Sequence, residues 1–146
     1  MKIGVASDHG GLDLKNEVKK YLQKNGYDVS DYGTYTNDSV DYPDFAEKLS
    51  KALLAGEFEK GILFCGTGIG ISIAANKIKG IYCGLIYDEF TARMAARHNN
   101  CNIVAIGGRT IGPGKACEMA KSFLSEKFEG ERHENRIAKI KKLENE

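Results

Sequence analysis

Apolar residues recur along the chain in short continuous runs that alternate with amphipathic stretches. The runs predict five buried strands, at residues 2–6, 27–29, 61–65, 81–86 and 103–106. Between the strands, apolar positions spaced three or four apart predict helices, as at Leu14, Val18 and Leu22. This alternation is typical of right-handed βαβ units. We therefore expect an α/β fold with three layers, a Rossmann-like open sheet of five parallel strands between helices.

Three of the predicted strands run directly into glycine-rich loops. These loops cover residues 8–11, 65–70 and 107–109, after the first, third and fifth strands. The carboxyl ends of parallel strands meet at one edge of the sheet, and ligands bind there in such folds. If the three loops converge at that edge, strands one, three and five are neighbours. This favours the strand order 2-1-3-5-4 over 2-1-3-4-5.

Composition and charge exclude several classes of protein. The 17 glycines and only 2 prolines among 146 residues favour tight turns over linkers. A net charge of +1 gives no global attraction for nucleic acid or membranes, so any anion site must be a local cluster. No apolar run approaches the roughly 20 residues of a membrane span. We expect one cytoplasmic domain over residues 1–146, whose four widely spaced cysteines are reduced and bind no metal.

The loop after the third predicted strand carries the most informative chemistry. Glycines at alternate positions of residues 66–70 leave backbone N–H groups uncovered at a helix start, an arrangement that binds anions. Cys65 stands at the edge of this loop, and a helix N-terminus favours the thiolate form of a cysteine. The alternatives are a tight strand–helix turn and a buried cysteine that acts as a small apolar residue. We assign that structural role to Cys83, Cys101 and Cys117.

Two polar pairs elsewhere are suited to proton transfer. Asp8 and His9 end the first strand at the predicted ligand edge, where a carboxylate and an imidazole can move protons or bind hydroxyls. The alternative is a carboxylate that caps the loop beside a solvated histidine. His98 and Asn99 lie near a helix end just before the fifth strand, and by themselves they favour a capping or solvated pair.

The last predicted helix, residues 131–143, differs from the others. Its apolar side is a narrow edge of Ile137, Ile140 and Leu143. Because this edge is too narrow for a core helix, we expect the helix to pack on a partner subunit. Arg132 and Arg136 share one face of it and could bind a phosphate together, although solvated charges are the more usual explanation of such a pair.

Taken together, these residues resemble the ribose-5-phosphate isomerase B family, which includes allose- and galactose-6-phosphate isomerases. The matching stretches are residues 7–11, 41–43, 65–77 and 97–99, and Arg132-His133 with Arg136. The thirteen-residue run from Cys65 is the most specific of them. The resemblance implies an aldose–ketose isomerase that needs no metal or other cofactor. It also implies dimers, sometimes tetramers, whose active sites contain residues of both subunits.

The resemblance further implies a role for each matching residue. Cys65 is the base that moves a proton between C1 and C2, because Ile71 occupies the place where some family members carry a glutamate base. His98 opens the sugar ring with help from Asp8. The reacting oxygens bind to the loop, which holds Gly66, Thr67, Gly68, Ile69 and Gly70. The phosphate-binding residues are His9, Arg109, Arg132 and Arg136, and the sugar pocket includes Tyr42 and Asn99.

The expected reaction is the interconversion of ribose 5-phosphate and ribulose 5-phosphate through an enediolate. Preorganised N–H donors of the glycine loop suit the oxyanion of such an intermediate. The motifs do not distinguish a pentose from a hexose 6-phosphate substrate. A non-catalytic sugar-phosphate sensor on the same fold is a further alternative. The joint presence of Cys65, Asp8 and His98 argues against a sensor, which needs no proton-transfer groups.

Overall fold

A five-stranded parallel sheet with the order β2-β1-β3-β5-β4 forms the centre of the computed structural model, which describes residues 1–146. The strands are β1 (Lys2–Ser7), β2 (Asp28–Asp31), β3 (Lys60–Cys65), β4 (Cys83–Leu85) and β5 (Ile103–Gly107). Every neighbouring pair is parallel. The order predicted from the three glycine-rich loops is therefore confirmed. Strand β4 is shorter than the apolar run at residues 81–86.

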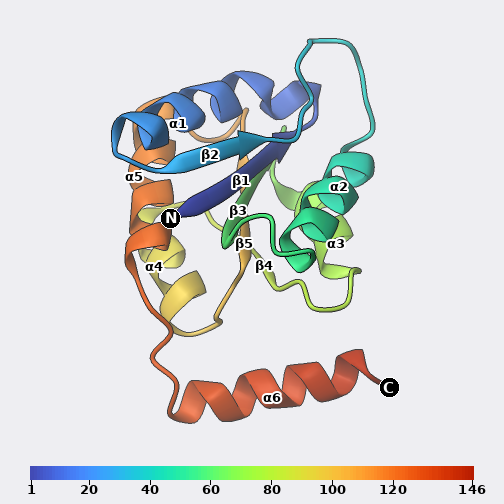
Figure 1. Cartoon of the computed structure of the whole chain (residues 1–146), viewed down its shortest axis with the longest axis vertical. Coiled ribbons are helices and arrows are strands. Elements are labelled where there is room, and N and C mark those ends of the chain that lie inside the picture. The colour runs from blue at the N-terminus through green and yellow to red at the C-terminus, as the bar shows by residue number, and fades with distance from the viewer.

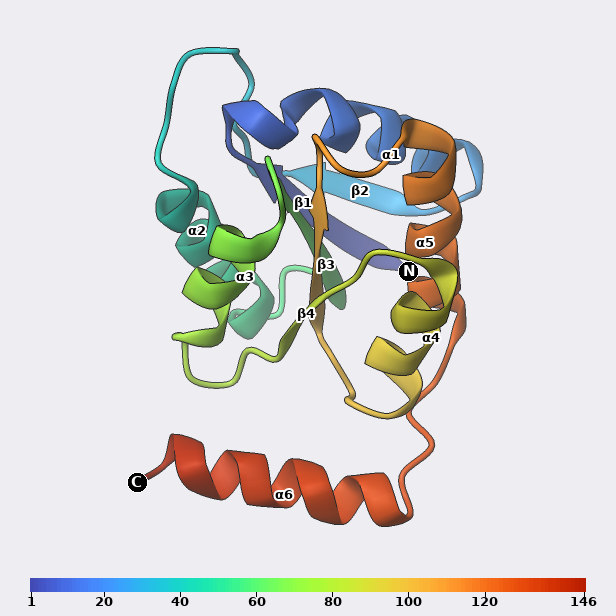
Figure 2. The same cartoon turned by 180° about the vertical axis from the view of Figure 1, so that it is seen from behind.

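Helices cover both faces of this sheet (Figures 1 and 2). One face packs on α1 (Leu12–Lys24), α4 (Glu89–Arg97) and α5 (Pro113–Ser125), and this layer holds a core of 19 buried residues. The other face packs on α2 (Tyr42–Leu54) and α3 (Ile69–Asn76), with a second core of 13 buried residues. The predicted three-layer architecture is thus confirmed. None of the helices is both long enough and apolar enough to cross a membrane.

Local sequence signals explain where several helices begin and end. The chain leaves α1 through Gly26, whose φ of +89° lies in the left-handed region that glycine adopts readily. Pro43 occupies the first turn of α2, where its missing N–H costs no hydrogen bond. Asp88 caps α4, because its side chain accepts the N–H of Thr91 at 2.7 Å. Cys83 and Cys101 are buried as predicted, whereas Cys117 on α5 is only partly buried and packs against the margin of the larger core.

The last helix, α6 (Arg132–Glu144), lies apart from the three layers, across the end of the sheet where the strands begin (Figure 1). Its first half buries His133 and Ile137. Near its end, Glu144 accepts hydrogen bonds from the Tyr82 hydroxyl at 2.7 Å and from the Gly80 N–H at 2.5 Å. Both ends of α6 are therefore held by its own chain, while Leu143 stays 69% exposed.

Candidate active site

The three glycine-rich loops meet at the carboxyl edge of the sheet, as predicted. The N–H of Asp8 donates to the carbonyl of Phe64 at 3.2 Å, and the N–H of Gly108 donates to the carbonyl of Cys65 at 2.8 Å. A Cβ atom at position 108 would lie only 2.6 Å from the carbonyl oxygen of Gly10. Glycine is therefore required there, because the loops approach each other through bare backbone.

Cys65 ends β3 and lies directly in front of the first turn of α3. It is 4% exposed, and its Sγ accepts the N–H of Gly68 at 3.2 Å. Gly68 has a φ of +80°, which turns the chain so that this N–H faces the sulfur. Negative charge on sulfur is stabilised both by this donor and by the helix N-terminus. Cys83 and Cys101 have no such position, since Cys83 begins β4 and Cys101 lies between α4 and β5. Cys65 is thus the buried cysteine in a setting suited to a base.

Asp8 and His9 lie beside this loop and are both oriented by backbone donors. Asp8 is 7% exposed, and its Oδ1 accepts the N–H of Gly11 at 3.1 Å, so it does cap the turn η1 (His9–Gly11). His9 Nδ1 accepts the N–H of Val40 at 3.2 Å. In the neutral imidazole, the proton is therefore assigned to Nε2, which leaves Nε2–H free to donate to a ligand.

Two more predicted residues border the same loop. A Cβ atom at position 70 would lie 2.6 Å from the ring of Tyr42, so the tyrosine ring rests directly on Gly70. A Cβ atom at position 66 would lie 3.2 Å from a guanidinium nitrogen of Arg109. The N–H of Arg109 also donates to the carbonyl of Gly66 at 2.9 Å. The structure therefore gathers one set of predicted residues around the sulfur, which we call the Cys65 half-site: Asp8, His9, Tyr42, Cys65, Gly66, Thr67, Gly68, Ile69, Gly70 and Arg109.

Lys15 stabilises the backbone next to this half-site, and the sequence analysis did not identify it. Its fully buried Nζ donates to Asp31 Oδ1 at 2.7 Å and to the carbonyl of Thr34 at 2.6 Å. Burial lowers the pKa of Lys15, and the hydrogen bond to Asp31 opposes that shift. Thr34 in turn donates its N–H to the carbonyl of Ser7, next to Asp8. The spacing of Lys15 from Val18 and Leu22 was an available signal, because it places the lysine on the apolar side of α1.

We expect Lys15→Met to lower the free energy of unfolding by about 3 kcal/mol, because it leaves the carboxylate of Asp31 and the carbonyl of Thr34 without their buried donor. Lys19→Met is the matched control. Lys19 contacts the other oxygen of Asp31 at 3.3 Å but is 32% exposed, so its loss should cost less than about 1 kcal/mol. Urea unfolding of both variants measures the difference, and equal losses would contradict the role assigned to Lys15.

The remaining predicted residues form a second group at the opposite end of the sheet, where the strands begin. His98 follows the last residue of α4, and its ring stacks on that of His133 with centroids 4.0 Å apart. Burial and the neighbouring His98 lower the pKa of His133. The carboxylate of Glu129 joins the group, with its Oε1 3.5 Å from His98 Nε2. We call this set the His98 half-site: His98, Asn99, Arg132 and Arg136, with Glu129 and His133, which were not predicted.

The two half-sites of one chain are separated by the length of the sheet. Cys65 pairs in register with Gly107, at the carboxyl end of β5, whereas His98 comes before Ile103, where β5 begins. Four residues of strand span about 13 Å. Cys65 and His98 of the same chain therefore cannot act on the same carbon skeleton at contact distance. A single chain therefore holds the predicted site residues as two separate groups, and the roles predicted for them stay predictions.

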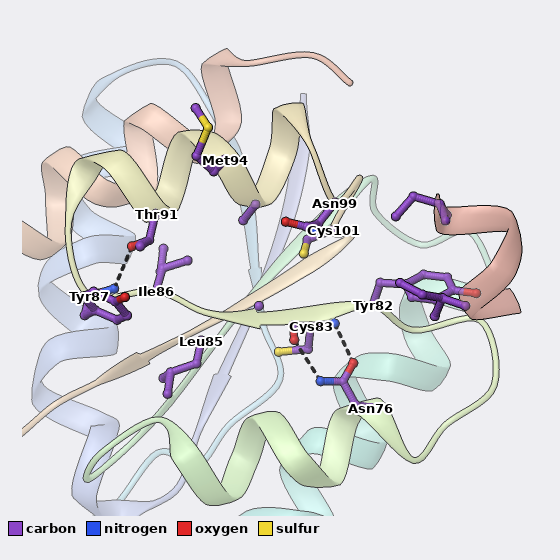
Figure 3. Close-up of a pocket in the computed structure, with 14 residues that line it drawn as sticks. Asn76, Tyr82, Cys83, Leu85, Ile86, Tyr87, Thr91, Met94, Asn99 and Cys101 are labelled. Atoms are coloured by element: carbon purple, nitrogen blue, oxygen red, sulfur yellow. Dashed lines mark hydrogen bonds between the residues drawn. The ribbon is translucent and has the colours of Figure 1, made fainter. Parts of the chain in front are cut away.

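An apolar groove opens between the two half-sites along the free edge of β4. It has a volume of about 430 Å³, and ten of its fourteen lining residues are hydrophobic (Figure 3). The side chain of Asn76 covers the edge at Cys83, since it accepts the Cys83 N–H at 2.7 Å and donates to the Cys83 carbonyl at 2.8 Å. Leu85 and Tyr87 beside it are 37% and 57% exposed. The groove contains no charged lining residue and does not itself resemble a phosphate site.

Comparison with known proteins gives one consistent answer. Residues 3–140 match the family described as Ribose/Galactose Isomerase. The chain is 48% identical to the putative sugar phosphate isomerase YwlF of Bacillus subtilis, over 99% of the chain and 97% of the relative. Ribose-5-phosphate isomerase B of Clostridium thermocellum has the same fold, with a TM-score of 0.97 and 48% identity over 99% of this chain and 98% of that one.

A further solved structure contains a ligand. Ribose-5-phosphate isomerase B of Mycoplasma genitalium with bound ribulose-5-phosphate has a TM-score of 0.93 and 39% identity, over 99% of this chain and 97% of that one. The family match, the relatives and the solved structures thus all indicate a sugar phosphate isomerase, and the matches cover nearly the whole chain, including both half-sites. The chain therefore belongs to the ribose/galactose isomerase family and is an aldose–ketose isomerase.

Proposed function

We propose that this enzyme interconverts ribose 5-phosphate and ribulose 5-phosphate, and that residues 1–146 act as one isomerase domain. The observation that carries the proposal is the position of the Cys65 sulfur, buried at the start of α3 and bonded to the N–H of Gly68. The ribulose-5-phosphate held by the similar Mycoplasma genitalium enzyme supports a pentose phosphate as substrate.

In the proposed reaction, the Cys65 thiolate removes the proton from C2 of the open-chain aldose and returns it to C1, while the proton of the C2 hydroxyl passes to the C1 oxygen. The negative charge that develops on the substrate oxygen is stabilised by N–H donors of residues 66–70 and by the Thr67 hydroxyl. Ile71, next along α3, is fully buried and apolar, so it cannot replace the thiolate as base. Proton transfer by a well-placed base contributes about 10²- to 10⁴-fold to a rate.

Ring opening and phosphate binding require both half-sites. We assign ring opening to His98 together with Asp8, and sugar contacts to Asn99 and Tyr42. The phosphate is bound by His9 and Arg109 of the Cys65 half-site and by the two arginines of α6, Arg132 and Arg136. Because one chain separates these groups by the length of the sheet, we propose that a second copy of the chain completes each site.

The free edge of β4 supports such an assembly. The groove along this edge is mainly apolar (Figure 3). Ile140 of α6 is one of its lining residues and is 43% exposed. Tyr87, which also lines the groove, is 57% exposed, and Phe90 in the first turn of α4 is 60% exposed. A contiguous apolar patch of this kind marks a protein contact surface. A homodimer through this face would carry the two half-sites of each chain toward those of its partner.

The proposed function is tested by comparing kcat/KM for ribose 5-phosphate with that for allose 6-phosphate and galactose 6-phosphate. We expect the pentose phosphate to be the best of the three substrates. Preference for a hexose 6-phosphate would retain the mechanism and change the substrate. Binding of sugar phosphates without turnover, and without exchange of substrate protons with solvent, would identify a sensor instead.

A further inference from the structure

Three side chains of metal-ligating type lie close together in the His98 half-site. His98 follows α4, His133 lies in the first turn of α6, and Glu129 lies in the segment between α5 and α6. One ligand atom of each lies within 4.8 Å of the other two. Glu129 Oε1 is 3.5 Å from His98 Nε2 and 3.7 Å from His133 Nε2. The end of α4 and the start of α6 therefore each bring an imidazole nitrogen close to one carboxylate oxygen.

The imidazole of His133 supplies an independent observation. Its side chain is only 7% exposed, and its Nε2 has no hydrogen-bond partner. The 3.7 Å to Glu129 Oε1 is too long for a hydrogen bond. A buried polar atom without a partner is rare and destabilising, so it calls for an explanation such as a bound ion. The unpaired nitrogen faces the same space as the carboxylate.

The carboxylate of Glu129 is already oriented for such a ligand. Its Oε2 accepts hydrogen bonds from Arg97, through Nε at 2.8 Å and through a terminal guanidinium nitrogen at 2.5 Å. Oε1 is thereby left facing the two imidazoles. A hydrogen bond to the second oxygen of a ligating carboxylate is the usual support for a metal ligand.

We propose that His98, Glu129 and His133 bind a divalent transition-metal ion, with Zn²⁺ as the reference case, and that the bound ion inhibits the isomerase. Two imidazoles and one carboxylate, with water as fourth ligand, form a common zinc ligand set. Ligands at about 2.0–2.1 Å from a tetrahedral ion lie roughly 3.4 Å apart. The two distances to Glu129 Oε1 are close to this value, and nitrogen ligands favour zinc, nickel and copper over magnesium and calcium.

One imidazole must turn when the ion binds. The two rings are stacked at 14° to each other, whereas a ligating imidazole holds its metal near the plane of the ring. His98 is the ring that turns, because a third of its side chain is exposed while His133 is buried. Arg132 and Arg136 on the same helix as His133 repel a cation, so we expect micromolar affinity rather than the tight binding of a structural zinc site.

Inhibition rests on the proposed function of His98. A nitrogen that binds a metal has its lone pair engaged, so the imidazole can no longer exchange a proton at that atom. His98 would then be unable to open the sugar ring. The ion would also join the end of α4 to the start of α6 and stabilise the folded chain, because it binds the folded state only.

Metal binding is tested directly by titrating ZnCl₂ into the full-length protein by calorimetry, in a Cys65→Ala background that removes the competing thiolate. We expect one equivalent per chain. Adding Glu129→Gln or His133→Gln should weaken binding at least about tenfold. Glu126→Gln is the matched control, because Glu126 also contacts Arg97, at 3.9 Å, but lies outside the cluster, and its substitution should leave binding unchanged. An unchanged zinc affinity in both cluster variants would overturn the proposed site.

Inhibition is tested separately in proteins that keep Cys65. ZnCl₂ should inhibit the wild-type isomerase, and a chelator should restore it. Each protein is compared with its own metal-free rate, and Glu129→Gln, which retains an oxygen for Arg97, should need at least about tenfold more zinc for half-maximal inhibition. Equal zinc sensitivity in both proteins would assign the inhibition to another site and overturn this part of the proposal. A wild-type protein that binds zinc but isomerises no sugar phosphate would contradict the proposed function and leave the metal site intact.

Discussion

Replacing Cys65 by alanine is expected to abolish isomerisation of ribose 5-phosphate while the sugar phosphate still binds. The thiol is the one group beside the glycine loop that we assign to carry the proton between C1 and C2. Its removal should lower kcat by at least about 10²- to 10⁴-fold. The phosphate-binding groups His9 and Arg109 are held by other contacts, and the alanine is smaller than the cysteine it replaces. Calorimetry should therefore find a Kd for the substrate close to that of the wild type.

The cysteine at position 117 provides the control for this experiment. Cys117→Ala removes a partly buried thiol from α5, outside both half-sites, and should leave kcat unchanged. Turnover in deuterated water adds a second readout, because a working base exchanges the transferred proton with solvent. Near-wild-type turnover, or continued deuterium incorporation in Cys65→Ala, would show that another group is the base.

The Cys65 half-site could be predicted from the sequence because its determinants are local. Glycines at positions 66, 68 and 70 leave the backbone uncovered whatever the rest of the chain does. The strand order also followed from glycines, since loops that approach through bare backbone must be neighbours. Gly108 shows this most clearly, because any side chain there would collide with Gly10. These local features do not depend on the packing of the rest of the chain, so the loops predicted to meet at this edge of the sheet do so in the structure.

Other parts of the site depend on contacts that no local pattern carries. Lys15 is a charged residue that would ordinarily be solvated, and its burial depends on Asp31 and the carbonyl of Thr34. Glu129 lies in a charged segment, so nothing in the sequence distinguishes its carboxylate from those of its neighbours. Its place between His98 and His133 follows only from how α6 packs on the end of α4. The separation of the two half-sites likewise follows from the register of β3 and β5, which the strand pattern leaves open.

Mixing two inactive variants should restore activity if each site is built from two chains. Cys65→Ala damages one half-site and His98→Ala damages the other, so each variant alone is expected to be inactive. In a mixed dimer, the intact Cys65 half-site of one chain meets the intact His98 half-site of its partner. Random reassociation makes half of all dimers mixed, and each has one intact site of two. About a quarter of wild-type activity should therefore return in the unfractionated mixture, and about half in purified mixed dimers.

The matched control places both lesions in the same half-site. Cys65→Ala mixed with Asp8→Asn gives dimers in which every Cys65 half-site is damaged, so no activity should return. Both mixtures are unfolded and refolded together in equal amounts, and mixed dimers are isolated through two different affinity tags before assay. Purified mixed dimers of Cys65→Ala and His98→Ala without activity would show that the second copy does not complete the site. Recovery in the first mixture alone would place Cys65 of one chain and His98 of its partner in one active site. Within a single chain, about 13 Å of strand separates the level of Cys65 from the start of β5, so the two residues cannot share a site there.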